Sequence, residues 1–137
     1  MRGSYFEEIV LGDVHETPGM TITSAHVAIY LGITRELAAE ASAVPDLLPL
    51  CLTTGLSWRV AKPTPVVLAF MGFDWEVLRA VRVGDTIMAR ARFVTKRAMR
   101  EAGVLVEERE VVDQRGEVVQ RGRLTYLVAK RAKEASV

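Results

Sequence analysis

Three carboxylates in a short alanine-rich stretch have the residue type and spacing for acid/base chemistry. Glu36 and Glu40 lie four residues apart, and Asp46 follows just before an apolar segment. Paired carboxylates can act as general acid and general base when their environments move their pKa values apart. Such side chains are more often solvated charges on a polar helix or loop, and the pattern favours that interpretation.

Cys51, His15 and His26 are the other side chains that could act as a nucleophile or transfer a proton. Cys51 is the single cysteine and lies near the amino end of an expected helix, where the pKa of a thiol is lowered. The sequence indicates no histidine partner for it, so a small buried core residue is the favoured interpretation. His15 at the start of an expected strand and His26 early in an expected helix are typical of structural or surface histidines.

The composition predicts one globular domain over residues 1–137 and excludes several classes of function. Hydrophobic residues make up 50% of the chain, which is enough for a core, and residues 129–137 are expected to form a frayed basic tail. The formal net charge of +1 provides no field that would attract nucleic acid or a membrane. One cysteine excludes an internal disulfide, and no metal-ligand spacing is present. Because the sequence has no apolar leader or spanning segment, we expect a cytoplasmic protein.

The first half of the chain predicts short elements around one capped helix. Residues 15–23 have the character of an edge strand, which a Pro-Gly pair interrupts. Thr23 or Ser24 can cap a short apolar helix that ends at Gly32. Residues 35–46 could form a polar helix or a loop.

Residues 50–60 predict a buried central helix. Leu52, Leu56 and Val60 recur every four residues, and an adjacent stripe consists of Cys51, Gly55 and Trp58. A helix that is apolar on most of its circumference is expected to be buried on most of it. Trp58 and Trp75 are both expected in the core or in a dimer interface.

From residue 66 onward the pattern changes to alternating strands. We expect these strands at residues 66–78, 85–97, 103–113 and 117–130, with a tight turn from Asp113 to Gly116 between the last two. The elements together predict an α+β fold in which a curved antiparallel β-sheet wraps a long central helix. Exposed edge strands in such a sheet would favour a dimer that extends it.

Several segments that span nearly the whole chain resemble the MaoC-like dehydratase family, which includes the R-specific enoyl-CoA hydratases. These segments are residues 6–13, 21–34, 75–87 and 94–97. The resemblance implies a single hot-dog domain that binds an acyl-CoA or acyl-carrier thioester, with the acyl chain running along the central helix. It also implies a homodimer, or a heterodimer with a paralogue. The coenzyme A thioester would be the substrate, and no separate cofactor is expected.

The catalytic motif of the family, Gly-Asp-x-Asn-Pro-x-His, is degenerate here. Arg35 occupies its glycine position, Glu36 its aspartate, Ala38 its asparagine, Ala39 its proline and Ala41 its histidine. In active members the aspartate and the histidine together activate water for addition to an enoyl double bond. The resemblance therefore leaves Glu36 as the one candidate catalytic residue.

The start of the central helix is where the resemblance places the thioester. The expected substrate-binding residues are Leu50, Cys51, Leu52 and Thr53, and the amide of Leu50 or Cys51 could polarise the thioester carbonyl. Thr53 and Thr54 could instead donate to helix carbonyls one turn back. Basic side chains could contact coenzyme A phosphates or form a solvated strand face: Arg79, Arg82, Arg90, Arg92, Lys96, Arg97 and Arg100.

Three functions are compatible with these residues. The first is an atypical enoyl-CoA hydratase or 3-hydroxyacyl dehydratase centred on Glu36. The second is a non-catalytic subunit that pairs with a paralogue carrying the complete dyad. The third is a hot-dog thioesterase that uses Glu36, Glu40 or Asp46.

Overall fold

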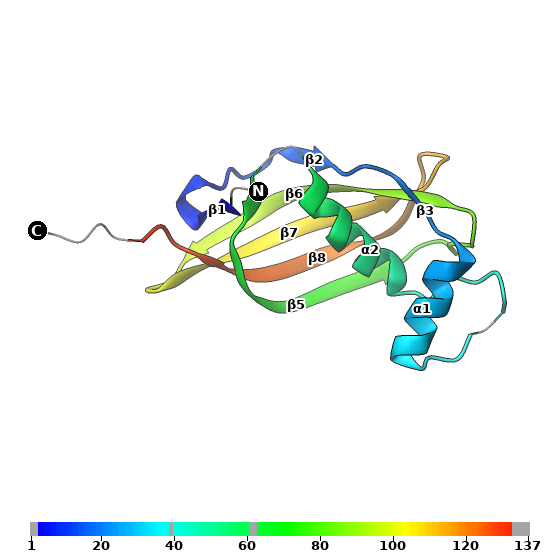
Figure 1. Cartoon of the computed structure of the whole chain (residues 1–137). Coiled ribbons are helices and arrows are strands. Elements are labelled where there is room, and N and C mark those ends of the chain that lie inside the picture. Colours follow the sequence, from blue (N-terminus) through cyan, green and yellow to red (C-terminus); the bar gives the residue numbers. More distant parts are fainter. Residues whose placement is uncertain (1–2, 39, 61–62, 133–137) are drawn as a thin grey trace, which may run out of the picture.

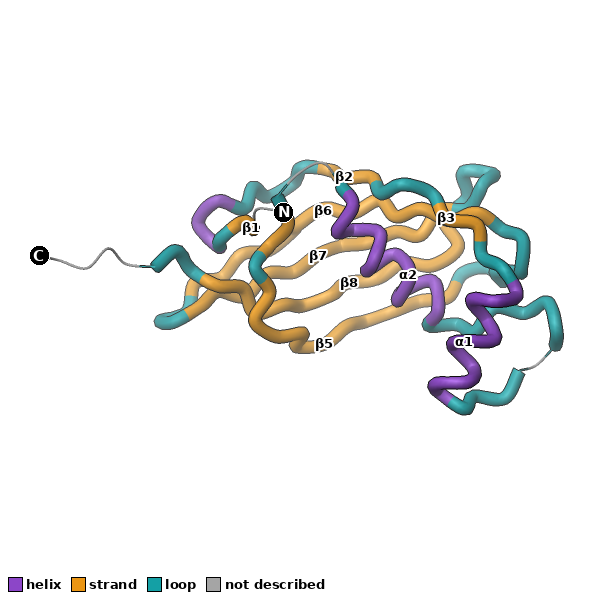
Figure 2. The backbone as a smooth tube through the Cα atoms, viewed as in Figure 1, coloured by secondary structure: helices purple, strands orange, loops and turns teal. Residues whose placement is uncertain are grey.

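A six-stranded antiparallel sheet with a short helix across one face forms the main layer of the protein (Figure 1, Figure 2). This computed structural model describes residues 3–38, 40–60 and 63–132. The strand order is β2-β6-β7-β8-β5, with β3 also pairing β6, and β1 pairs β4 in a separate two-stranded unit. The elements are β1 (Gly3–Ser4), η1 (Phe6–Glu8), β2 (Val14–Glu16), β3 (Met20–Thr21), α1 (Ser24–Thr34), α2 (Leu48–Leu56), η2 (Ser57–Arg59), β4 (Thr64–Pro65), β5 (Val67–Val77), β6 (Thr86–Ala98), β7 (Ala102–Val112) and β8 (Val118–Ala129).

The predicted meander of long strands is confirmed. Strands β5, β6, β7 and β8 each fall within one or two residues of the expected boundaries. The turn between β7 and β8 forms as expected, because Gly116 adopts a positive φ of 79° and its N–H donates to the Asp113 carbonyl at 3.0 Å. The Asp113 carboxylate also accepts from the backbone N–H of Arg115 and of Glu117, which fixes the turn.

Helix α2 is buried along one stripe only. It begins at Leu48, two residues before the expected start, because proline is well tolerated in the first turn. Leu48, Leu50, Thr53 and Leu56 are buried, whereas an outer stripe of Cys51, Thr54, Gly55 and Trp58 is exposed. The prediction of burial on most of its circumference is therefore wrong, since the sheet covers one side of the helix. The core interpretation is also wrong for Cys51 and Trp58.

Helix α1 is longer than expected. Thr23 caps it, as predicted: its side chain accepts from the backbone N–H of His26, and the His26 ring accepts from the Thr23 N–H at 2.9 Å. The helix continues through Gly32, which costs only about 1 kcal/mol inside a helix. It ends at Arg35, which adopts a left-handed φ of 61° and donates to the Leu31 carbonyl. The described residues between Arg35 and α2 form a loop.

Two apolar clusters join the sheet to the helices. The first lies around the start of α2 and includes Leu48, Ile87 and Val111. The second lies beneath Leu50 and includes Leu105, Leu124 and Val128. Trp75, predicted in the core or in a dimer interface, is half-buried; it packs against both clusters and donates to Gln120 Oε1 at 2.9 Å. Within the described chain, no helix is long and apolar enough to cross a membrane.

Candidate functional site

Glu36 lies on the loop that follows α1 and pairs with Tyr30 of that helix. The Tyr30 hydroxyl donates to Glu36 Oε1 at 3.3 Å, and the Glu36 backbone N–H donates to Thr34 Oγ1. The Glu36 side chain is otherwise exposed. A carboxylate and a phenol in hydrogen-bond contact provide a proton acceptor and a fixed donor.

Tyr30 brings the predicted site residues together. Burial raises the pKa of the Tyr30 phenol, and the neighbouring Glu36, Cys51 and Asp46 raise it further, because negative charge opposes its ionisation. Tyr30 also packs against the first apolar cluster, which lies around the start of α2, so the phenol lies between this cluster and the Glu36 loop, and it keeps its proton. The sequence pattern indicated no functional role for Tyr30, because its spacing with Val27 and Leu31 is that of a packed helix residue. The available signal was the hydroxyl group that Tyr30 adds to this apolar helix face.

The predicted substrate-binding residues at the start of α2 differ in how exposed they are. Leu50 and Thr53 are buried, Leu52 is half-buried and Cys51 is exposed. The Cys51 amide donates to the Leu47 carbonyl at 3.1 Å, so the Leu50 amide is the better candidate for a thioester oxygen. Thr53 Oγ1 donates to the Pro49 carbonyl at 2.9 Å, as expected for a threonine that satisfies the preceding turn.

Glu40 does not join Glu36 in a carboxylate pair. Its side chain forms an exposed ion pair with Arg82 at 2.5 Å. Ala38 and Ala41 are exposed loop residues, and Ala39 lies outside the described residues. The loop conformation removes the helical spacing that would have placed the two glutamates on one face.

Most of the basic side chains of residues 79–100 form surface ion pairs. Arg79, Arg82, Arg90, Arg92 and Arg100 each contact a carboxylate within 4 Å, and Lys96 donates to the Ile9 carbonyl at 2.9 Å. This arrangement fits a solvated strand face better than a phosphate-binding cluster.

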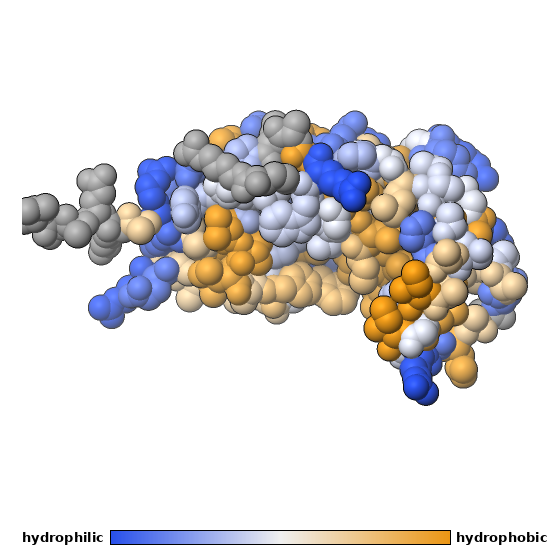
Figure 3. Space-filling model, viewed as in Figure 1, coloured by the Kyte–Doolittle hydropathy of each residue, from blue (hydrophilic) through white to orange (hydrophobic). Residues whose placement is uncertain are grey.

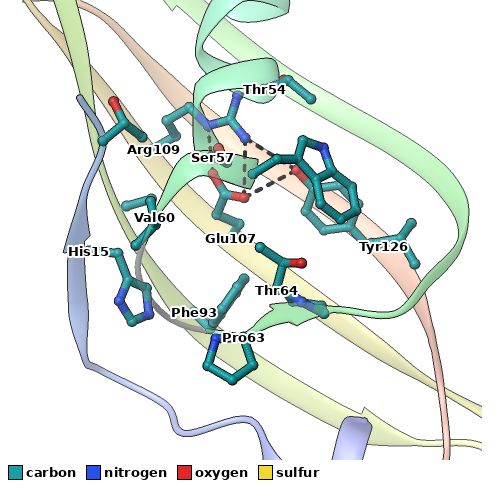
Figure 4. Close-up of a pocket in the computed structure, with 15 residues that line it drawn as sticks. His15, Thr54, Ser57, Val60, Pro63, Thr64, Phe93, Glu107, Arg109 and Tyr126 are labelled. Carbon is teal, nitrogen blue, oxygen red and sulfur yellow. Dashed lines mark hydrogen bonds and ion pairs between the residues drawn. The ribbon is translucent and has the colours of Figure 1, made fainter. Parts of the chain in front are cut away.

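A pocket of about 120 Å³ lies at the far end of α2 (Figure 4). Its walls are mostly apolar and come from η2, the described residues between η2 and β4, strands β4 and β5, and β6: Trp58, Val60, Pro63, Pro65, Val67 and Phe93. His15 of β2 also lines it, with its ring 6.0 Å from that of Phe93. The position of His15 at the start of an expected strand gave no indication that it would line a pocket.

The floor of this pocket is a buried network of Glu107, Arg109 and Tyr126. Arg109 is 1% exposed, and its Nε donates to Glu107 Oε2 at 2.6 Å. The Tyr126 hydroxyl donates to Glu107 Oε1 at 3.1 Å. Figure 4 shows the three side chains converging beneath α2. Sequence reasoning missed the network, although Glu107 and Arg109 share one face of β7 with the apolar Leu105 and Val111.

Arg109 also fastens α2 to the sheet. Its Nη1 donates to Thr54 Oγ1 at 2.8 Å, to Thr53 Oγ1 at 3.2 Å and to the Leu50 carbonyl at 3.4 Å. One guanidinium thus neutralises Glu107 and holds two turns of the helix. A planar fork of donors suits this dual role.

Replacing Tyr126 with phenylalanine should reduce the loss of stability above about pH 10. Burial, followed by the Glu107 charge, raises the pKa of Tyr126 well above its usual value of about 10. The folded protein then keeps a proton that the unfolded chain releases. The stabilisation is fully present below about pH 10 and is lost as the pH rises toward the folded pKa. Urea unfolding at about pH 8 and about pH 11 measures the difference.

The matched control is Tyr5→Phe, because Tyr5 is exposed. This variant should lose as much stability as the wild type between the two pH values. Equal losses in the wild type and in Tyr126→Phe would contradict the prediction.

No protein-family model and no curated protein sequence matches the chain, but solved structures do. The monoamine oxidase regulatory protein from Archaeoglobus fulgidus is 26% identical, with a TM-score of 0.85 over 96% of this chain and 98% of that one. A MaoC-like dehydratase from Rhodospirillum rubrum is 20% identical, with a TM-score of 0.76 over 96% and 100% of the two chains. The R-hydratase PhaJ1 from Pseudomonas aeruginosa is 15% identical, with a TM-score of 0.75 over 97% and 92%.

Proposed function

We propose, starting from the hot-dog fold that this chain shares with MaoC-like dehydratases and R-hydratases, that it binds an acyl thioester along α2 and hydrates an enoyl group beside Glu36. The observation that carries the proposal is the hydrogen bond from Tyr30 to Glu36, next to the apolar cluster around the start of α2. A carboxylate survives there where the resembling family has its catalytic aspartate. The reverse reaction would dehydrate a 3-hydroxyacyl thioester at the same site.

A single carboxylate can perform both proton transfers of this reaction. Glu36 takes a proton from water as the water oxygen bonds to C3 of the enoyl group, and negative charge moves to the thioester oxygen. The Leu50 amide at the start of α2 would stabilise that oxygen. The Glu36 carboxyl then returns the proton to C2, so that the carboxylate is regenerated. Tyr30 keeps its own proton and holds Glu36 in position.

Replacing Glu36 with glutamine should lower the hydration rate about 100-fold to 10,000-fold, because the proton acceptor is lost. Tyr30→Phe should lower it about 10-fold to 100-fold, the value of one hydrogen bond to a charged group. Glu40→Gln is the matched control, since Glu40 pairs with Arg82 at the surface, and it should leave the rate unchanged. The assay follows hydration of a panel of enoyl-CoAs by the purified chain.

Other results of this assay would identify the alternatives. Thiol release from acyl-CoAs that Glu36→Gln abolishes would indicate a thioesterase. Binding without turnover, together with co-purification of a dyad-bearing paralogue, would indicate a non-catalytic subunit. The exposed Ala41 at the family's histidine position favours that second candidate. Turnover that survives in Glu36→Gln would contradict the catalytic proposal.

Strand β5 is the edge on which a partner subunit would dock. It pairs β8 on one side and ends the strand order on the other. Its exposed side chains include Leu68, Phe70, Met71, Phe73 and Val77. Figure 3 shows apolar residues along this edge and over α1. A long apolar edge strand is a template for pairing with another chain, so a second copy or a paralogue would extend the sheet through β5.

A further inference from the structure

The pocket at the end of α2 lies where an acyl chain that starts at Leu50 would arrive. Ser57 lies seven positions after Leu50, which corresponds to about 10 Å along a helix. The pocket volume of about 120 Å³ is comparable with that of apolar cavities that bind a benzene-sized group. Its apolar walls suit a hydrocarbon chain, but its floor contains the buried charges of Glu107 and Arg109.

The donors of Arg109 on this floor are already committed. A guanidinium carries five N–H groups. Nε and Nη2 of Arg109 donate to the two oxygens of Glu107, Nη2 also approaches the Tyr126 hydroxyl, and Nη1 donates to α2. A new acceptor would therefore have to displace a bond that already exists.

The hydroxyl donors of the floor are committed as well. Tyr126 donates to Glu107, Thr54 donates to the Leu50 carbonyl at 2.8 Å, and Ser57 donates to the Thr53 carbonyl at 2.8 Å. What remains at the floor is acceptor capacity. The Glu107 carboxylate accepts three bonds out of about four lone-pair sites, and Ser57, which lines the pocket, has a hydroxyl oxygen with lone pairs of its own.

We infer that this pocket selects acyl chains whose far end carries a hydrogen-bond donor, such as a hydroxyl group, over chains that end in a methyl or a carboxylate. The inference rests on the proposed acyl-thioester function and specifies its substrate class. A terminal hydroxyl can donate to Glu107 or Ser57 in a site from which water is displaced. A terminal methyl covers these acceptors without satisfying them. A terminal carboxylate brings a second negative charge to Glu107 and finds the floor donors occupied.

The test compares three acyl-CoAs of equal length that end in a hydroxyl, a methyl or a carboxylate, over several lengths. Calorimetric titration of the full chain should show the hydroxyl-ended thioester binding about 10-fold to 100-fold more tightly than the methyl-ended one, the value of a hydrogen bond to a charged group. The carboxylate-ended thioester should bind most weakly. This ranking is measured on the wild-type protein, so it does not depend on a variant that folds.

A variant then locates the effect. Ser57→Ala removes one acceptor and should reduce the preference for the hydroxyl, whereas Ser42→Ala, a serine on the loop before α2, should leave it unchanged. Equal affinities for the three thioesters, or tightest binding of the carboxylate, would overturn the inference while leaving the proposed function intact. Binding of none of them would overturn the proposed function, and this inference with it.

Discussion

Replacing Arg109 with methionine is expected to lower the free energy of unfolding by about 3–5 kcal/mol. The substitution keeps an unbranched apolar stem but leaves the Glu107 carboxylate buried without its counter-charge. Glu107 is 6% exposed, so water cannot replace the lost bonds. The helix also loses its anchor, because Arg109 donates to Thr53 and Thr54. Equilibrium unfolding in urea measures the loss as a lower midpoint.

Arg92→Met is the matched control. Arg92 lies on neighbouring strand β6 and contacts Glu108 at 2.8 Å, but its side chain is 50% exposed. An exposed pair of this kind contributes about 1 kcal/mol or less. Glu107→Gln combined with Arg109→Met removes both charges and should recover part of the stability lost in the single variant. A loss in Arg109→Met no larger than that in Arg92→Met would show that the buried network does not hold the helix.

The long strands could be predicted closely from the sequence because their signals are local. Alternation of small or apolar residues with arginine from Ala89 to Phe93 marks the middle of β6, and Gly116 marks the turn before β8. The resemblance to MaoC-like proteins was equally accessible, and the solved structures confirm it at the level of the fold. Neither signal depends on contacts between distant segments.

Helix ends and burial were predicted less well because tertiary contacts decide them. Gly32 has the chemistry of a helix stop, yet α1 continues to Thr34. The apolar character of residues 50–60 predicted burial on most of the helix circumference, but one sheet covers only one side of α2. The side of α2 that faces away from the sheet therefore keeps its apolar residues exposed.

The candidate site shows the same division. Glu36 was accessible through the family motif, but its contact with Tyr30 depends on the left-handed turn at Arg35. The Glu107–Arg109 pair left a local trace, two opposite charges on the apolar face of β7. The contacts of Arg109 with α2 join residues more than 50 positions apart in the sequence, so no local pattern indicates them.

Replacing Leu68 and Met71 together with lysine should convert a dimer of this protein into a monomer. Leu68 is 57% exposed and Met71 is 55% exposed, so each change removes little packing within the chain. In a dimer paired through β5, two-fold symmetry would bring four added positive charges into one interface from which water is excluded. Charged side chains on an edge strand, lysine above all, block pairing with another strand. Light scattering on a sizing column should show the mass falling from two chains to one.

Met99→Lys is the control, because Met99 is similarly exposed but lies beyond the end of β6, in the connection to β7, away from the β5 edge. It should leave the mass unchanged. Unfolding curves of the lysine variant should keep a single transition, since the β5 backbone bonds to β8 remain. If the double variant stays dimeric, another surface joins the subunits, and the exposed apolar residues of α1, Ile29 and Ile33, become the next surface to change. If the wild type is itself a monomer that gains mass only with a paralogue, β5 is a heterodimer edge and the two lysines should abolish that pairing instead.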